Sequence, residues 1–307
     1  MTARAALPPG LGTAFRIDTA RAAGVSRGRL GASDLSTPTR GARIVVGADH
    51  DARLAAVLGV LRPDAFAMGR TAARWYGLPL PAPPSDEPPA VFDIGVPRGV
   101  RAPRRAGVRG RSVDIEEREL MAVAPGLRLT SPARTWLDLG GELGLADLVA
   151  VGDALLRPPH ERSTPGELRA TVAAHPRSPG SARAREALPL LSPLAESPQE
   201  SRLRILLHLA GFRSAEVNVS LFDGRRFVAR VDLLFREYGI AVEYEGGHHG
   251  ADPTQWRRDM TRIGAVQALG IIVERVHADD LRQPRALFDR LAAHLRRRGW
   301  NGTYLAP

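Results

Sequence analysis

Two neighbouring apolar segments, residues 227–235 and 240–245, carry carboxylates where burial is expected. Their aliphatic, β-branched composition and the short stretch between them predict an antiparallel strand pair. Side chains two apart on a strand share a face, so Glu243 lies with Glu245, and Asp232 of the partner strand can lie beside them. Because buried carboxylates are costly without a partner, this pattern favours a hard cation such as Mg²⁺ or Mn²⁺. The alternative is an exposed sheet face whose acids are solvated.

The composition bounds the class of protein. At 307 residues the chain is long enough for two or three domains, and 44% hydrophobic with 25% charged residues is ordinary for a globular protein. The absence of cysteine excludes disulfides and cysteine-ligated metals, and it fits a reducing cytoplasm. The N-terminus lacks the apolar core of a signal peptide, and no apolar run reaches a membrane span. We therefore expect a cytoplasmic protein without a membrane partner.

The positive charge of the chain comes entirely from arginine. All 43 basic residues are arginine, none is lysine, and the formal net charge is +10. This balance favours binding to the phosphate backbone of nucleic acid. The base composition of the genome is an alternative source of the arginine bias, and both explanations can hold.

Residues 1–50 contain the pattern of a winged-helix-like DNA-binding unit. Asp18 or Thr19 can cap a first helix, Gly24 supplies a turn, and Ser26 can cap a second helix. Residues 37–46 would then form the wing. Four arginines of the second helix and the wing are expected to bind nucleic acid: Arg27, Arg29, Arg40 and Arg43. An ordinary helical hairpin is the alternative.

Three phrases of this region resemble the N-terminal part of the abortive-infection AbiEi antitoxin family, which begins with a winged helix. They are AAGVSR at residues 22–27, RGAR at 40–43 and TAARWYGLPL at 71–80. The resemblance implies that the N-terminal region binds DNA.

Residues 51–175 are predicted to form an α+β middle region, followed by a linker and helix over residues 176–195. The arginines from Arg98 to Arg111 can track a nucleic-acid backbone, although such a run is more often a solvated face. His160 and His175 are expected at the surface, because neither has a second metal ligand at a suitable spacing.

Residues 196–307 follow the element order αβββαβα. With Asp on the second strand and Glu-x-Glu on the third, this order resembles the PD-(D/E)xK nuclease superfamily. It is most similar to the Vsr-like domains, which are related to very-short-patch-repair endonucleases. The resemblance spans about residues 196–298. It implies a restriction-endonuclease-like α/β fold, with a mixed sheet flanked by helices.

The residues that match the Vsr-like pattern fall on four elements. They are Glu200 and Arg204, Arg230 and Asp232, Glu243 with Glu245, Gly246 and His249, and Arg258 with Asp259 and Arg262. The resemblance implies that Asp232 and Glu243 bind the metal, and that Glu200 supports it. His249 is expected to act as acid or base near the phosphate.

Several of these residues have a second interpretation. Glu200 also completes a Ser-x-x-Glu capping box, and Asp259 with Arg262 can be a helix ion pair. We expect three arginines of this region to bind nucleic acid: Arg230, Arg258 and Arg262.

The superfamily's lysine is replaced in this chain. Its position falls on Glu245, and no other lysine is present. That lysine normally activates water or stabilises charge in the transition state. Arg258 or Arg262 can stabilise charge, but arginine cannot act as a base at neutral pH. The Vsr-like branch also lacks the lysine.

These patterns lead to three hypotheses. The first is a Mg²⁺-dependent endonuclease that hydrolyses phosphodiester bonds in DNA and has an N-terminal DNA-binding region. The second is a non-enzymatic, antitoxin-like DNA-binding regulator with a degenerate nuclease fold. The third is an interaction module whose acidic cluster binds a basic protein. Convergence of carboxylate oxygens on one cation-sized point favours the first.

Overall fold

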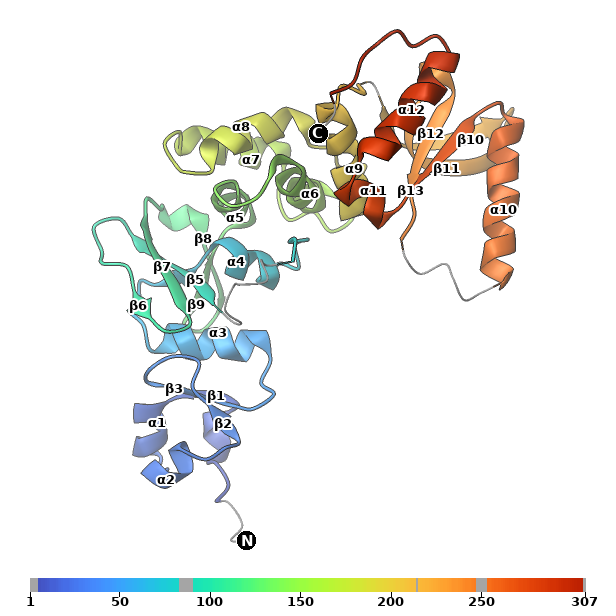
Figure 1. Ribbon diagram of the computed structural model, residues 1–307. Helices are drawn as coiled ribbons and strands as arrows, with labels where there is room; N and C mark the ends of the chain where they lie inside the picture. The colour runs from blue at the N-terminus through green and yellow to red at the C-terminus, as the bar shows by residue number, and fades with distance from the viewer. Residues whose placement is uncertain (1–4, 83–90, 214, 247–252, 306–307) are drawn as a thin grey trace. The chain divides into compact units, whose positions relative to one another are not determined.

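The computed structural model describes residues 5–82, 91–213, 215–246 and 253–305, without the side chains of residues 253–259. The chain divides into two compact units, each built from two segments (Figure 1). Unit 1 contains Met1–Gly141 and Ala170–Ser181, and unit 2 contains Glu142–Arg169 and Ala182–Pro307. The sequence predicts a middle region over residues 51–175, but residues 142–169 belong to unit 2.

The first part of unit 1 has two short helices and a small antiparallel sheet of order β1-β3-β2. The elements are β1 (Ala14–Arg16), α1 (Ile17–Ala22), α2 (Arg27–Leu30), β2 (Leu35–Ser36) and β3 (Ala42–Val45). Ser26 caps α2 by accepting the backbone N–H of Arg29 at 3.2 Å. Gly24 makes the turn between the helices with a φ of 82°, which side chains disfavour. The core of this part includes Phe15 and Leu30.

The larger part of unit 1 is a six-stranded mixed sheet of order β6-β7-β5-β4-β9-β8. Its strands are β4 (Phe66–Ala67), β5 (Phe92–Pro97), β6 (Arg104–Arg105), β7 (Val108–Val113), β8 (Leu120–Ala124) and β9 (Leu127–Thr130). Its helices are α3 (His50–Gly59), α4 (Gly69–Trp75) and α5 (Pro132–Leu139). The sequence patterns did not indicate β4, β6 or β8, because β4 and β6 have two residues each and β8 is largely exposed.

The next three α-helices after α5 lie between it and residue 188. They are α6 (Leu145–Leu156), α7 (Pro165–Ala174) and α8 (Ser181–Ala187). The capping box predicted at the start of α7 is present, since Thr164 accepts the N–H of Glu167 and the Glu167 carboxylate accepts the N–H of Thr164. In the described part of the chain, no helix combines the length and apolar character needed to span a membrane.

Unit 2 is organised around a four-stranded sheet of order β10-β11-β12-β13. Its elements are α9 (Pro198–Leu209), β10 (Glu216–Asp223), β11 (Arg226–Phe235), β12 (Ile240–Tyr244), α10 (Pro253–Ala268), β13 (Ile272–Val276), α11 (Ala278–Arg282) and α12 (Arg285–Arg297). The first three strands are antiparallel, and β13 joins β12 in parallel, because α10 carries the chain back across the sheet. This is the predicted order with one addition, the short helix α11.

Helices cover both faces of this sheet (Figure 1). On one face, Leu203 of α9 and Leu291 of α12 pack against Val242. On the other face, Val266 of α10 packs with Val231 and Ala241. Neighbouring residues of β12 therefore enter different cores, and a polar side chain on either face is held close to a helix.

A buried carboxylate joins α6 to α9 within unit 2. Asp153 accepts hydrogen bonds from the Ser201 hydroxyl at 2.7 Å, from Arg204 at 2.8 Å and from the backbone N–H of Ser192 at 2.7 Å. Burial raises the pKa of Asp153 above its ordinary value, and these three donors act in the opposite direction. Arg204, one of the residues that match the Vsr-like pattern, is therefore a packing residue that binds α6.

Candidate functional site

Asp232 lies where β11 and β12 separate. The register between the two strands runs from Phe235–Ile240 to Leu233–Val242 and stops there. One residue further, the Asp232 carboxylate accepts the backbone N–H of Tyr244 at 2.8 Å. A side chain thus takes the place of a backbone carbonyl as the acceptor at this point of the sheet.

The strand on the other side of Asp232 is also irregular. Asn218 lies between the pairs that join β10 to β11 on either side of Asp232, and its φ is 49°. Asparagine tolerates this left-handed conformation better than most residues. The Asn218 amide donates to Glu200 at 2.8 Å and to the Leu194 carbonyl at 2.6 Å. This contact ties the first turn of α9 to the sheet.

Glu200 takes part in capping the start of α9, and its charge also acts on Asp232. Its backbone N–H donates to the Ser197 hydroxyl at 3.1 Å, as the capping box predicts. Its carboxylate accepts the N–H of Glu196 at 2.9 Å, one residue earlier than the usual partner. The side chain is buried, and its charge reaches Asp232.

Two other carboxylates, Glu200 of α9 and Glu243 of β12, therefore act electrostatically on Asp232 of β11. Burial, followed by the charges of Glu200 and Glu243, raises the pKa of Asp232 to about 6. The Tyr244 N–H and Arg262 act in the opposite direction. The raised pKa of Asp232 therefore reflects burial first, and the negative charges of the two glutamates add to it.

Arg262 of α10 holds the third carboxylate of the cluster. Its two terminal nitrogens bind the two oxygens of Glu243 at 2.7 Å each. The Glu243 residue is only 5% exposed, whereas the Arg262 side chain is 35% exposed. Such a two-point pair fixes the orientation of both side chains. The predicted contact of Arg262 with Asp259 lies outside the described side chains.

The other predicted site residues are placed elsewhere or are not described. Glu245 binds Arg275 of β13, and its second oxygen lies 3.9 Å from His277. The exposed Arg230 pairs with Glu196 at 2.7 Å. His249 and the side chain of Arg258 lie outside the described residues.

The donor set of this cluster fits a hard cation. Within the described residues, no group of three or more His, Cys, Asp or Glu side chains has the geometry to hold a metal ion. Mg²⁺, however, commonly uses only one or two carboxylates and completes its shell with water and phosphate oxygens. Asp232 and Glu243 can supply such a pair, provided that Glu243 releases Arg262.

The four N-terminal arginines divide into two kinds. Arg29 pairs with Asp34 through two contacts, at 2.9 and 2.8 Å, and Arg43 donates to the carbonyls of Leu30 and Ala42. Arg27 and Arg40 are exposed. Arg29 and Arg43 therefore hold the small domain together, and Arg27 with Arg40 remain the candidates for nucleic-acid contact.

A second cluster of buried charges lies in unit 1, and the sequence analysis missed it. Arg134 of α5 is 2% exposed and binds Asp138 and Glu119, each at 3.0 Å. His175 lies 2.7 Å from Glu119 and is mostly buried, so its predicted surface position is wrong. The i, i+4 spacing of Arg134 and Asp138 was the available signal. His160, in contrast, is exposed as expected.

Comparison with known proteins gives relatives without an assigned activity. Two uncharacterized proteins of Mycobacterium tuberculosis, from strains CDC 1551 and H37Rv, are each 32% identical over 173 residues. The match covers 56% of this chain and 63% of each relative, so the chain spans less than two thirds of their length. No family model matches the chain, and no solved structure matches it.

Proposed function

We propose that unit 2 is a metal-dependent nucleic-acid endonuclease of restriction-endonuclease-like fold, and that unit 1 supplies a DNA-binding region. The supporting observation is that the charges of Glu200 and Glu243 act on the partly buried Asp232 where β11 and β12 separate. An excess of buried negative charge at one point attracts a cation, because the cation restores the ionised state of every carboxylate around it.

Asp232 and Glu243 would hold Mg²⁺ or Mn²⁺, with Glu200 in support from α9. When bound there, the ion would polarise the scissile phosphate and orient a water molecule for attack. Tyr244 contributes by fixing one Asp232 oxygen through its backbone N–H. Asn218 does the same for Glu200.

Arg262 must exchange partners for this chemistry. It now neutralises Glu243, but a phosphate group offers a guanidinium the same two-point contact. A substrate phosphate near α10 would draw Arg262 away and leave Glu243 ionised for the cation. Arg262 would then stabilise charge on the phosphate, although it cannot remove a proton from water.

The same ion pair favours a second candidate function. If Arg262 replaces the cation permanently, the site is a degenerate nuclease site within an antitoxin-like DNA-binding regulator. The missing lysine agrees with this alternative.

A plasmid-nicking assay with Mg²⁺, Mn²⁺ or a chelator, run beside thermal melts, decides between the two functions. Wild type should nick DNA and melt at a higher temperature with metal, because metal binds the folded state. Asp232→Asn and Glu243→Gln should lose both effects.

Glu216→Gln is the matched control, since Glu216 is also a strand glutamate held at two points by an arginine, Arg236, but is exposed. It should behave as wild type. Absence of both nicking and a metal-dependent melt in wild type would support the regulator instead.

A further inference from the structure

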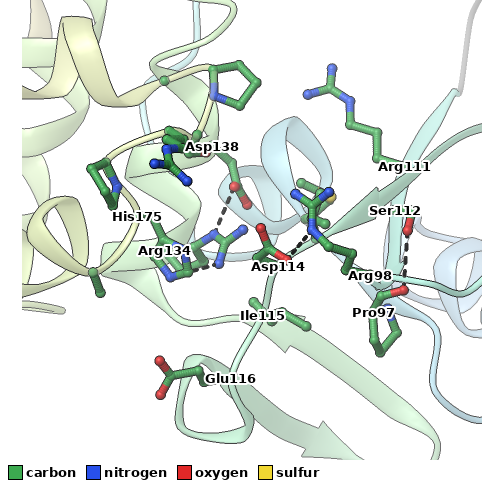
Figure 2. A pocket seen from close by; sticks show the side chains of 18 residues that line it. Pro97, Arg98, Arg111, Ser112, Asp114, Ile115, Glu116, Arg134, Asp138 and His175 are labelled. Atoms are coloured by element: carbon green, nitrogen blue, oxygen red, sulfur yellow. Dashed lines mark hydrogen bonds and ion pairs between the residues drawn. The ribbon is translucent and has the colours of Figure 1, made fainter.

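A large cleft lies within unit 1. Its volume is about 1240 Å³, and its walls come from β5, from β7 with the residues that follow it, from α5 and from residues 174–180. Figure 2 shows Arg98 and Arg111 on one side of it, and Arg134, Asp138 and His175 on the other. The cleft exceeds the usual size of a small-molecule site, so it has room for a ligand of that size.

The α5 side of the cleft is rigid. Arg134 binds Asp138, Glu119 and His175, and His175 binds Glu119 in turn. The loop before α8 presses on the end of α5 so closely that a Cβ on Gly180 would lie 1.9 Å from the Leu137 carbonyl oxygen. Side chains on this wall are therefore fixed before any ligand arrives, which lowers the entropy lost on binding.

Asp138 presents an unused acceptor on that wall. Its first oxygen accepts Arg134, whereas its second oxygen is buried and has no hydrogen-bond partner among the residues that the structure describes. The residue is only 8% exposed and lines the cleft. Buried acceptors are normally satisfied, so this oxygen calls for an N–H or O–H donor from outside the protein.

The opposite side and the rim of the cleft supply positive charge. Arg98 pairs with Asp114 at the surface, and the charge of Arg111 reaches Asp138. Arg177 is exposed and also lines the cleft. The apolar side chains of Met68, Val113 and Ile115 also line the cleft. The cleft thus offers an anion-binding rim, an apolar surface and one buried acceptor.

We propose that this cleft binds a nucleoside phosphate, with a base N–H on the free oxygen of Asp138 and the phosphate on Arg98, Arg111 and Arg177. Arginine is well matched to phosphate oxygens, and the flat apolar faces of a base suit the lining between the two polar ends. The same chemistry can come from a free nucleotide or from the 5′-terminal nucleotide of a strand. The proposal does not depend on the proposed nuclease activity of unit 2.

Isothermal titration of the full chain with AMP, GMP, CMP and UMP tests the proposal. At least one nucleotide should bind, and Asp138→Asn and Arg111→Gln should each weaken its binding about tenfold or more, as expected for loss of a charge-assisted hydrogen bond. Asp64→Asn and Arg62→Gln are matched controls, because this exposed pair lies in the same unit but outside the cleft. Both should bind as wild type does.

A third variant distinguishes loss of binding from misfolding of the buried network, because it lies outside that network. Ala174→Trp places a bulky side chain at an exposed position of the lining, and it should block binding while the thermal melt stays unchanged. A 5′-phosphorylated oligonucleotide that competes better than any mononucleotide assigns the site to strand ends. Binding of inorganic phosphate as tight as that of the nucleotides would overturn the nucleoside assignment. No binding, or binding that all three variants leave intact, would overturn the site.

Discussion

In unit 1 the buried Arg134 binds two carboxylates and approaches a histidine, whereas in unit 2 the partly exposed Arg262 binds Glu243 and its charge also acts on Asp232. The first cluster contains an ion pair at i, i+4 within α5, between Arg134 and Asp138. The second lies where two strands separate and keeps an excess of negative charge. Similar side chains thus give a closely hydrogen-bonded wall in one unit and, in the other, the cluster that we propose as a cation site.

The largest expected effect tests whether the two clusters belong to independent folding units. Residues 142–307 should unfold cooperatively in urea as an isolated fragment, because they contain all of unit 2. Residues 191–307 begin in the linker that the sequence predicts and lack α6, so Arg204 loses Asp153 and one side of α9 is exposed. This shorter fragment should aggregate or unfold without a sharp transition. Equal cooperativity and equal urea midpoints for both fragments would contradict this boundary.

The next expected effect is a difference in stability between variants of Arg134 and of Arg262. Arg134→Met should cost about 3–5 kcal/mol of unfolding free energy, since it leaves buried carboxylates without their cation. Arg262→Met should cost less, about 1–2 kcal/mol, because water reaches its site. Urea titrations with and without Mg²⁺ give the comparison. Mg²⁺ should restore the stability of Arg262→Met but not that of Arg134→Met, and rescue of both or neither would remove the distinction.

A third test uses the titration of Asp138. Burial is the main cause that raises its pKa from 3.8 to about 6. Between about pH 4 and pH 6 the folded state holds more protons than the unfolded state, so stability falls as pH rises and levels off above that window. The full change for this group is about 3 kcal/mol. Asp138→Asn should flatten the profile by that amount, and an unchanged profile would argue that Asp138 titrates normally.

The smallest expected effect concerns the N-terminal arginines. Two of them have partners within the protein, and two are exposed. Replacing Arg27 and Arg40 with Ala should reduce the salt dependence of DNA binding by about one unit of slope per lost phosphate contact. Replacing Arg29 and Arg43 should lower the melting temperature instead, because their partners lie within the unit. Binding measured between low and moderate salt shows which pair contacts DNA. A larger slope change from Arg29 and Arg43 would reverse the assignment.

Local patterns predicted the elements of unit 2 well. The strands β11 and β12 and the hairpin before them follow from aliphatic runs broken by Asp223–Gly224 and by Gly239, whose φ values permit tight turns. The placing of Asp232 near Glu243 follows from the same pairing. The sequence did not indicate that the pairing ends at Leu233. The end depends on the Asp232 carboxylate, which accepts the Tyr244 N–H in place of a backbone carbonyl.

Contacts across long stretches of sequence were beyond such patterns. His175 lies 56 residues from Glu119, and Arg204 lies 51 residues from Asp153. In each case the sequence shows an isolated polar residue, and only the packing of distant helices reveals its partner. Asp153, an acid within the apolar α6, was the hint in the sequence that this helix needs a polar neighbour.

The chain passes between the two units at three places, after Gly141, after Arg169 and after Ser181. During synthesis, α6 leaves the ribosome before residues 170–181 complete unit 1, and it waits for α9 to be made. Unit 1 can therefore be completed while the first segment of unit 2 is still without its partner. For the same reason, a protease that cuts once between Arg169 and Ala170 would leave two polypeptides, each containing part of both units. Such a nicked protein should separate in denaturing gels yet elute as one species in native buffer.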